Sequence, residues 1–130
     1  MRALYVAAAL VTIGVGLAVH LGGTFLPPSV RDVMGDALWA MMIAWWVAAL
    51  GPQLPPVTRS LAAVAICFAV ELSQLVHTPG LDAVRRSAPG HWVLGSGFDP
   101  RDLAAYALGV AVAAVVDRAA RGHLERRAPG

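Results

Sequence analysis

The sequence has few charged residues, a single cysteine and no lysine. Charged residues make up 14% of the 130 positions, against roughly 25% in soluble domains. All ten basic residues are arginines, and eight Asp plus Glu leave a net charge of +2. This balance is too mild to predict a nucleic-acid partner. Cys67 has no second cysteine with which to form an intramolecular disulfide.

Sequence motifs of several common chemistries are also missing. Gly95-Ser96-Gly97 lacks the lysine of a phosphate-binding loop, and no serine lies in a nucleophile elbow. No pair of histidines has metal-ligand spacing. We therefore expect no metal and no cofactor, and the sequence leaves open whether any residue is catalytic.

Hydrophobic residues, in contrast, make up 58% of the chain and are grouped in long runs. A run of about 20 apolar residues is what a helix needs to cross a bilayer. We predict one all-α integral membrane domain over residues 1–130, an antiparallel bundle of four transmembrane helices with a long loop between helices 3 and 4. The predicted spans are about 3–21, 35–51, 58–76 and 102–117, followed by a basic tail over 118–130.

The arginines predict the orientation of these spans. With four spans both termini share one side, and that side collects six arginines: Arg2, Arg59, Arg118, Arg121, Arg126 and Arg127. The other side has four in longer loops: Arg31, Arg85, Arg86 and Arg101. Because cytoplasmic loops are enriched in basic residues, we expect both termini in the cytoplasm.

Polar residues gather at the opposite end of the predicted bundle. Glu71 and Gln74 lie one helical turn apart near the end of the third span, where an ionisable residue is a functional-site hypothesis by default. The same topology brings Asp36, Asp102 and Tyr106 to that end. Counted from their aspartates, the second and fourth spans are short, so we expect these acids to begin the helices and line a wet pocket.

Arg85 and Arg86, in the following connection, are the expected partners of these carboxyls. The predicted ligand-binding residues are therefore Asp36, Glu71, Gln74, Arg85, Arg86, Asp102 and Tyr106. The alternative is that Glu71 and Gln74 only hydrogen-bond Asp102, Tyr106 or the backbone and so hold the third span against the fourth.

The polar segments also carry a family resemblance. Gly35–Ala40, Glu71–Leu75, Leu81–Arg85, Leu94–Phe98 and Asp102–Tyr106 resemble, in order, the bacterial family called domain of unknown function 2809. The resemblance implies a small four-span protein of the bacterial cytoplasmic (inner) membrane, with no established activity. A weaker resemblance is to the VanZ-like family, associated with teicoplanin resistance. Glu71, Gln74, Asp102 and Gly109 match its pattern, whereas Tyr106 stands where Asn is usual.

From these observations we expect a cell-envelope protein whose polar pocket opens at the outer leaflet. Its expected partners are membrane lipids, with a lipid head group or a lipid-linked glycan of an envelope precursor as the ligand. Two alternatives stay open: a membrane enzyme using Glu71 and Asp102 for acid–base chemistry on a lipid-linked substrate, and a structural subunit of a membrane complex. The sequence does not determine the oligomeric state.

Overall fold

The computed structural model describes residues 1–95 and 97–128, which contain helices and no strand. The helices are α1 Arg2–Gly22, α2 Pro28–Leu50, α3 Pro56–Ser73, α4 Pro79–Arg86, α5 Ala88–Leu94 and α6 Pro100–Arg127. Four of them, α1, α2, α3 and α6, are long and apolar enough to cross a membrane. The predicted all-α membrane fold is thus confirmed. Ser96 and the last two residues of the predicted tail lie outside the described residues.

Proline marks the beginning of every helix after α1. Each of α2 to α6 has a proline at its first or second position. Proline suits this place because its fixed φ is already helical and its missing N–H would have no helical partner. Side chains of Thr78, Ser87 and Asp99 cap the N-termini of α4, α5 and α6.

Two helices are longer than their predicted spans. The α2 helix begins at Pro28 and has 23 residues, and α6 continues through Arg127 with 28 residues. At 1.5 Å per residue they measure about 35 and 42 Å, more than the roughly 30 Å of a bilayer core. The helices themselves are therefore not short, whereas the bounds of the membrane spans within them stay a prediction. Asp102 does lie in the first turn of α6, but Asp36 lies two turns inside α2.

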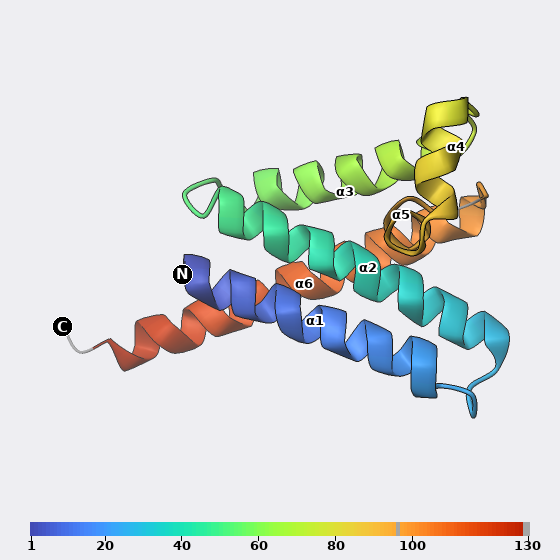
Figure 1. Cartoon of the computed structure of the whole chain (residues 1–130). Coiled ribbons are helices and arrows are strands. Elements are labelled where there is room, and N and C mark those ends of the chain that lie inside the picture. Colours follow the sequence, from blue (N-terminus) through green and yellow to red (C-terminus); the bar gives the residue numbers. More distant parts are fainter. Residues whose placement is uncertain (96, 129–130) are drawn as a thin grey trace.

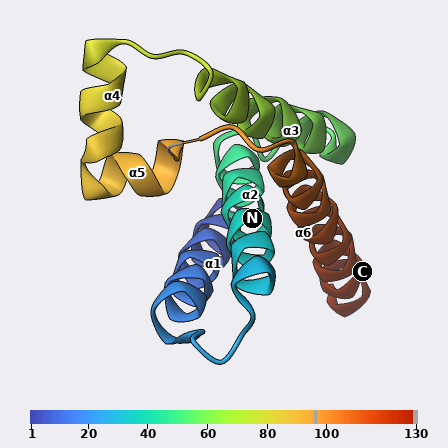
Figure 2. The same ribbon diagram turned by 90° about the vertical axis from the view of Figure 1, so that its right-hand side faces the viewer.

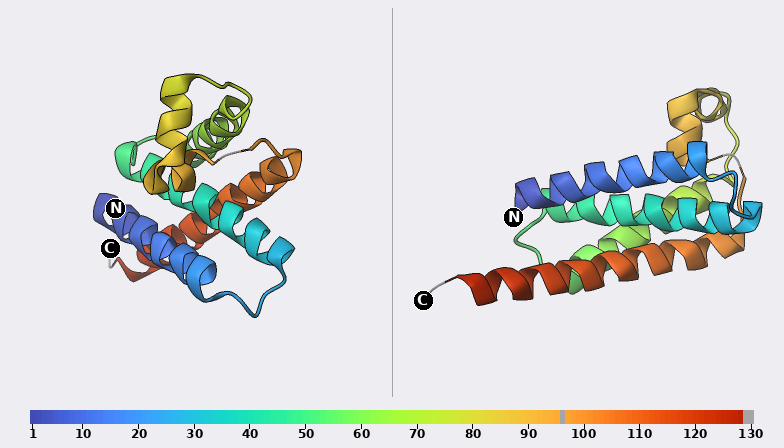
Figure 3. Two further views of the ribbon diagram at one scale, coloured as in Figure 1. Left: turned by 45° about the vertical axis from the view of Figure 1, so that its right-hand side comes forward. Right: turned by 90° about the horizontal axis from the view of Figure 1, so that it is seen from below.

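The four long helices run alternately up and down, and both chain ends lie at the same end of the bundle (Figure 1). The α2 helix is central, because it packs against α1, α3 and α6. The short helices α4 and α5 stand at the end away from the termini, to one side of the long helices (Figure 2). At the other end α6 projects beyond the remaining helices (Figure 3).

Small residues allow these helices to approach closely. The buried residues are mainly alanines, grouped around Tyr5 and Trp45 near the termini and around Cys67 and Tyr106 toward the other end. Large apolar side chains such as Leu61 and Val115 point outward, with 65% and 69% of their surface exposed. An apolar surface of this kind suits a lipid environment.

Gly109 marks the closest approach of α6 to α2. A Cβ atom at this position would lie 2.1 Å from the carbonyl oxygen of Ala37. We expect Gly109→Ala to lower the free energy of unfolding by about 1–3 kcal/mol, because the backbones must move apart. Unfolding in mixed detergent micelles measures this change. Gly14→Ala is the matched control, since a Cβ there has no neighbour within 4 Å, and equal effects of the two variants would contradict the prediction.

Candidate functional site

Glu71 lies on the last full turn of α3 and is completely buried. Its Oε1 accepts a hydrogen bond from the backbone N–H of Asp99 at 2.8 Å. Its Oε2 accepts bonds from the Tyr106 hydroxyl at 2.8 Å and from Nε2 of Gln74 at 3.3 Å. Both oxygens are thus occupied by donors within the protein. Glu71 joins α3 to α6 and to the segment that leads into α6.

Gln74 lies three residues after Glu71 and supports the same segment. Its side chain packs against Gly95, whose backbone has a φ of 66°. A Cβ atom at position 95 would lie 2.6 Å from Nε2 of Gln74. Glycine therefore suits this position twice, because it adopts positive φ at little cost and leaves room for the amide. The Glu-x-x-Gln spacing places both side chains on the helix face that receives the chain returning to α6.

Asp36 and Asp102 bring a second pair of carboxyls to this end, from α2 and α6. The two carboxyls lie near each other and near the carboxyl of Glu71. Among the described residues, no arginine forms an ion pair with any of these three acids.

Arg85 was expected to pair with these carboxyls, but it has other partners. Its Nη1 donates to the carbonyl of Val76 at 2.8 Å and to Asp82 at 3.3 Å, and its Nη2 donates to the carbonyl of Ser73 at 2.5 Å. The last carbonyls of a helix have no partners within the helix, so a nearby cation readily satisfies them. Arg85 thereby fastens α4 to the end of α3.

An open hollow of about 590 Å³ lies next to this contact. It is lined by His77, Asp82, Arg85, Arg86, Ser87, Ala88, His91 and Trp92. His77, Arg86, His91 and Trp92 are exposed, so their polar groups can meet a ligand. The Trp92 ring also lies edge-on to His20 at the end of α1, with 6.4 Å between ring centroids.

The predicted site residues therefore fall into two groups. Asp36, Glu71, Gln74, Asp102 and Tyr106 form one cluster among the ends of α2, α3 and α6. Arg85 and Arg86 line the hollow instead. His77 and His91, which were not among the predicted residues, complete the hollow. Both histidines lie in the same polar connection as Arg85, Arg86 and Trp92. This clustering in the sequence could have indicated the hollow.

A family model described as "Protein of unknown function (DUF2809)" matches residues 25–110. The chain belongs to this family. The match covers about two thirds of the chain and includes both the cluster around Glu71 and the hollow. No solved structure matches the chain. The resemblance to the VanZ-like family stays a prediction.

A second buried polar cluster lies at the end of the bundle that holds both termini. Its members are Tyr5, Arg59, Asp117 and Arg121, from α1, α3 and α6. Arg59 donates from Nη1 to the Tyr5 hydroxyl at 2.9 Å and from Nη2 to Oδ2 of Asp117 at 2.8 Å. The Tyr5 hydroxyl donates to Oδ1 of Asp117 at 2.8 Å. Arg121 bonds both Tyr5 and Asp117 through Nε, each at 3.1 Å.

Sequence reasoning missed this second cluster, because its arginines were used only to predict membrane topology. Arg59 and Asp117 are 4% and 9% exposed, so they are core residues of the bundle rather than surface charges. The sequence does place opposite charges, Arg59 and Asp117, at the same end of the third and fourth predicted spans. That placement is the signal that could have indicated this cluster. Three of the four residues, Tyr5, Asp117 and Arg121, lie outside the segment that the DUF2809 model matches.

Proposed function

We propose that this membrane protein binds the anionic head group of a lipid or of a lipid-linked envelope precursor. The hollow beside α4 and α5 is the binding site in this proposal. The observation that carries it is the combination of Arg86, His77 and His91 around one open space of about 590 Å³. Ligand sites in proteins commonly measure 300–1,000 Å³, so a phosphate-bearing head group fits.

The chemistry of the lining residues supports this ligand class. Arginine presents several donors in a plane that matches phosphate oxygens, and basic pockets at the ends of transmembrane helices bind anionic head groups. Arg86 forms no ion pair with any residue that the structure describes. Oδ1 of Asp82 faces His77 and Arg85, so its second carboxylate oxygen is the acceptor that the hollow offers to the glycerol or sugar hydroxyls of such a ligand. Exposed Trp92 suits the depth of lipid head groups.

In this proposal the cluster around Glu71 holds the elements of the site in place and does not contact the ligand. Arg85 fastens α4 to α3, and Glu71 and Gln74 hold the chain that follows α5. The arginine distribution predicts cytoplasmic termini, and on that basis the hollow would open at the outer leaflet.

Acid–base catalysis by Glu71 and Asp102 would require both carboxyls to reach a substrate. Internal donors occupy both oxygens of Glu71, and neither carboxyl lines the hollow. Head-group binding is therefore the function that the geometry favours over an enzyme.

Native mass spectrometry of the purified protein with phosphatidylglycerol tests the proposal. We expect Arg86→Gln to reduce the bound lipid about tenfold, as the loss of one charge-assisted hydrogen-bonding group would. Arg101→Gln is the matched control, because it removes the same charge from an exposed position at the same end of the bundle. Equal lipid retention by the wild type and both variants would rule out the proposed site.

A further inference from the structure

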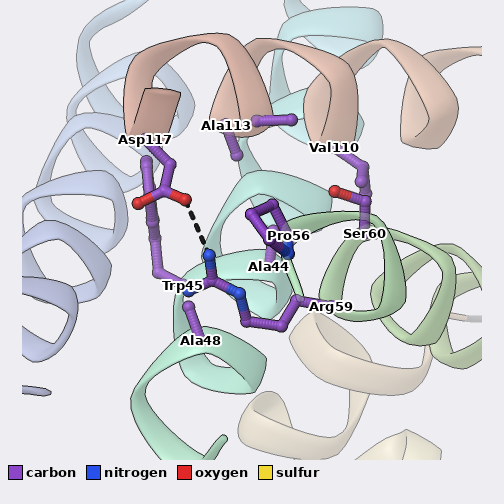
Figure 4. A pocket seen from close by; sticks show the side chains of 10 residues that line it. Ala44, Trp45, Ala48, Pro56, Arg59, Ser60, Val110, Ala113 and Asp117 are labelled. Carbon is purple, nitrogen blue, oxygen red and sulfur yellow. Dashed lines mark hydrogen bonds and ion pairs between the residues drawn. The ribbon is translucent and has the colours of Figure 1, made fainter. Parts of the chain in front are cut away.

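The second polar cluster borders a small cavity between α2, α3 and α6. The cavity has a volume of about 30 Å³ and is lined mainly by small or apolar residues, with Arg59, Ser60 and Asp117 as its polar members. Figure 4 shows the Arg59 side chain extending across this space toward Asp117, with the Ser60 hydroxyl directed into it. Two lining residues near the start of α3 reach the surface, because Pro56 is exposed and Ser60 is half-buried.

One donor of Arg59 has no partner in this cavity. The Nη1 and Nη2 groups are bonded to Tyr5 and Asp117, but the buried Nε has no hydrogen-bond acceptor. The Arg59 side chain is only 5% exposed. Burying a donor of a charged group without an acceptor is costly, so an acceptor that reached Nε through the cavity would stabilise Arg59.

The charge of the cluster indicates what kind of acceptor this is. Two guanidinium groups, of Arg59 and Arg121, share the single carboxylate of Asp117, which leaves one positive charge uncompensated. The N-terminus of α3 adds to this potential, since its N-cap Pro55 provides no side-chain hydrogen bond. Helix N-termini attract anions because their N–H groups and dipole point outward.

We propose that this cavity receives one oxygen of a phosphate group, which accepts hydrogen bonds from Nε of Arg59 and the hydroxyl of Ser60. A cavity needs about 10–15 Å³ of this kind to hold one water molecule, so a volume of about 30 Å³ admits an oxygen atom while the rest of the phosphate stays outside. The phosphate belongs either to a phospholipid of the leaflet on the terminus side or to free inorganic phosphate. This site is separate from the hollow at α4 and α5 and lies at the opposite end of the bundle.

The experiment measures phosphatidylglycerol binding by native mass spectrometry in an Arg86→Gln background, so that the first hollow contributes little. Ala114→Leu fills the cavity, and Ser60→Ala removes one donor without disturbing the bonds of Arg59. We expect each to reduce lipid binding, Ala114→Leu by about tenfold. Ala111→Leu is the control, because it adds the same volume on an exposed face of α6 and should leave lipid binding unchanged.

A second measurement separates the two sources of phosphate. Thermal unfolding is followed with and without inorganic phosphate for the same variants, with circular dichroism as the test of folding. A phosphate-dependent rise in the midpoint that Ala114→Leu and Ser60→Ala abolish, together with unchanged lipid binding, assigns the site to free phosphate. If neither lipid binding nor the midpoint responds to Ala114→Leu or Ser60→Ala, the cavity holds only water and the proposal is wrong.

Discussion

Replacing Asp117 with alanine is expected to lower the free energy of unfolding by about 3–5 kcal/mol, the range found when one partner of a buried ion pair is removed. Asp117 accepts hydrogen bonds from Tyr5, Arg59 and Arg121. Its loss would leave the guanidinium of Arg59 buried without a counter-charge. Unfolding in mixed detergent micelles, followed by circular dichroism, measures the change.

A matched control and a double variant make this prediction specific. Glu125→Ala removes an acid from an exposed position further along α6 and should change the stability by no more than about 0.5 kcal/mol. The double variant Arg59→Met with Asp117→Leu removes the buried guanidinium together with its carboxylate, and only the partly exposed Arg121 loses an ion pair. The loss of stability should therefore be smaller than the sum of the two single losses. Additive losses would mean that the two residues do not interact as the structure indicates.

Replacing Glu71 with alanine is the second large effect, with an expected loss of about 2–4 kcal/mol. The substitution leaves the Tyr106 hydroxyl, the Asp99 N–H and the Gln74 amide without their shared acceptor, and each buried donor without a partner costs about 1–3 kcal/mol. The segment leading into α6 should also become less protected. Amide hydrogen exchange at Asp99 measures this protection directly.

Tyr106→Phe is the control for the Glu71 prediction. It removes one donor but leaves the bond between Glu71 and the Asp99 N–H in place. We expect a smaller loss of about 1 kcal/mol and unchanged exchange at Asp99. If exchange at Asp99 is the same in Glu71→Ala and in the wild type, Glu71 does not hold this segment.

The sequence was sufficient to predict which end of the bundle each polar residue occupies. Alternating spans determine this position, so Glu71, Asp102 and Tyr106 could be assigned to one end without knowledge of helix packing. The sequence does not indicate how each helix is rotated about its own axis, and so which side chains face the neighbouring helices. Alanine-rich spans that are apolar on all sides have no distinct polar stripe that would predict it. For this reason the pairing of Arg59 with Asp117 was missed.

The partners of Arg85 could not be predicted for a different reason. A guanidinium near the end of a helix can pair with a carboxylate or with the last backbone carbonyls, and the path of the loop decides between them. Here the turn after α3 brings Arg85 onto the carbonyls of Ser73 and Val76. The early start of α2 has a similar origin, because Pro27-Pro28 is read equally well as the interruption of a helix and as the beginning of one.

The position of α6 in both polar clusters has a consequence for biogenesis. Tyr5 and Asp117 are separated by 112 positions in the sequence, and Glu71 and Tyr106 by 35. A ribosome therefore delivers Arg59 and Glu71 to the membrane before either has the α6 partner that satisfies it. Insertion of the last span therefore completes both polar clusters, one at each end of the bundle. A nascent chain that stops before α6 has an arginine without its counter-charge, Asp117, and a glutamate without the hydrogen bond from Tyr106.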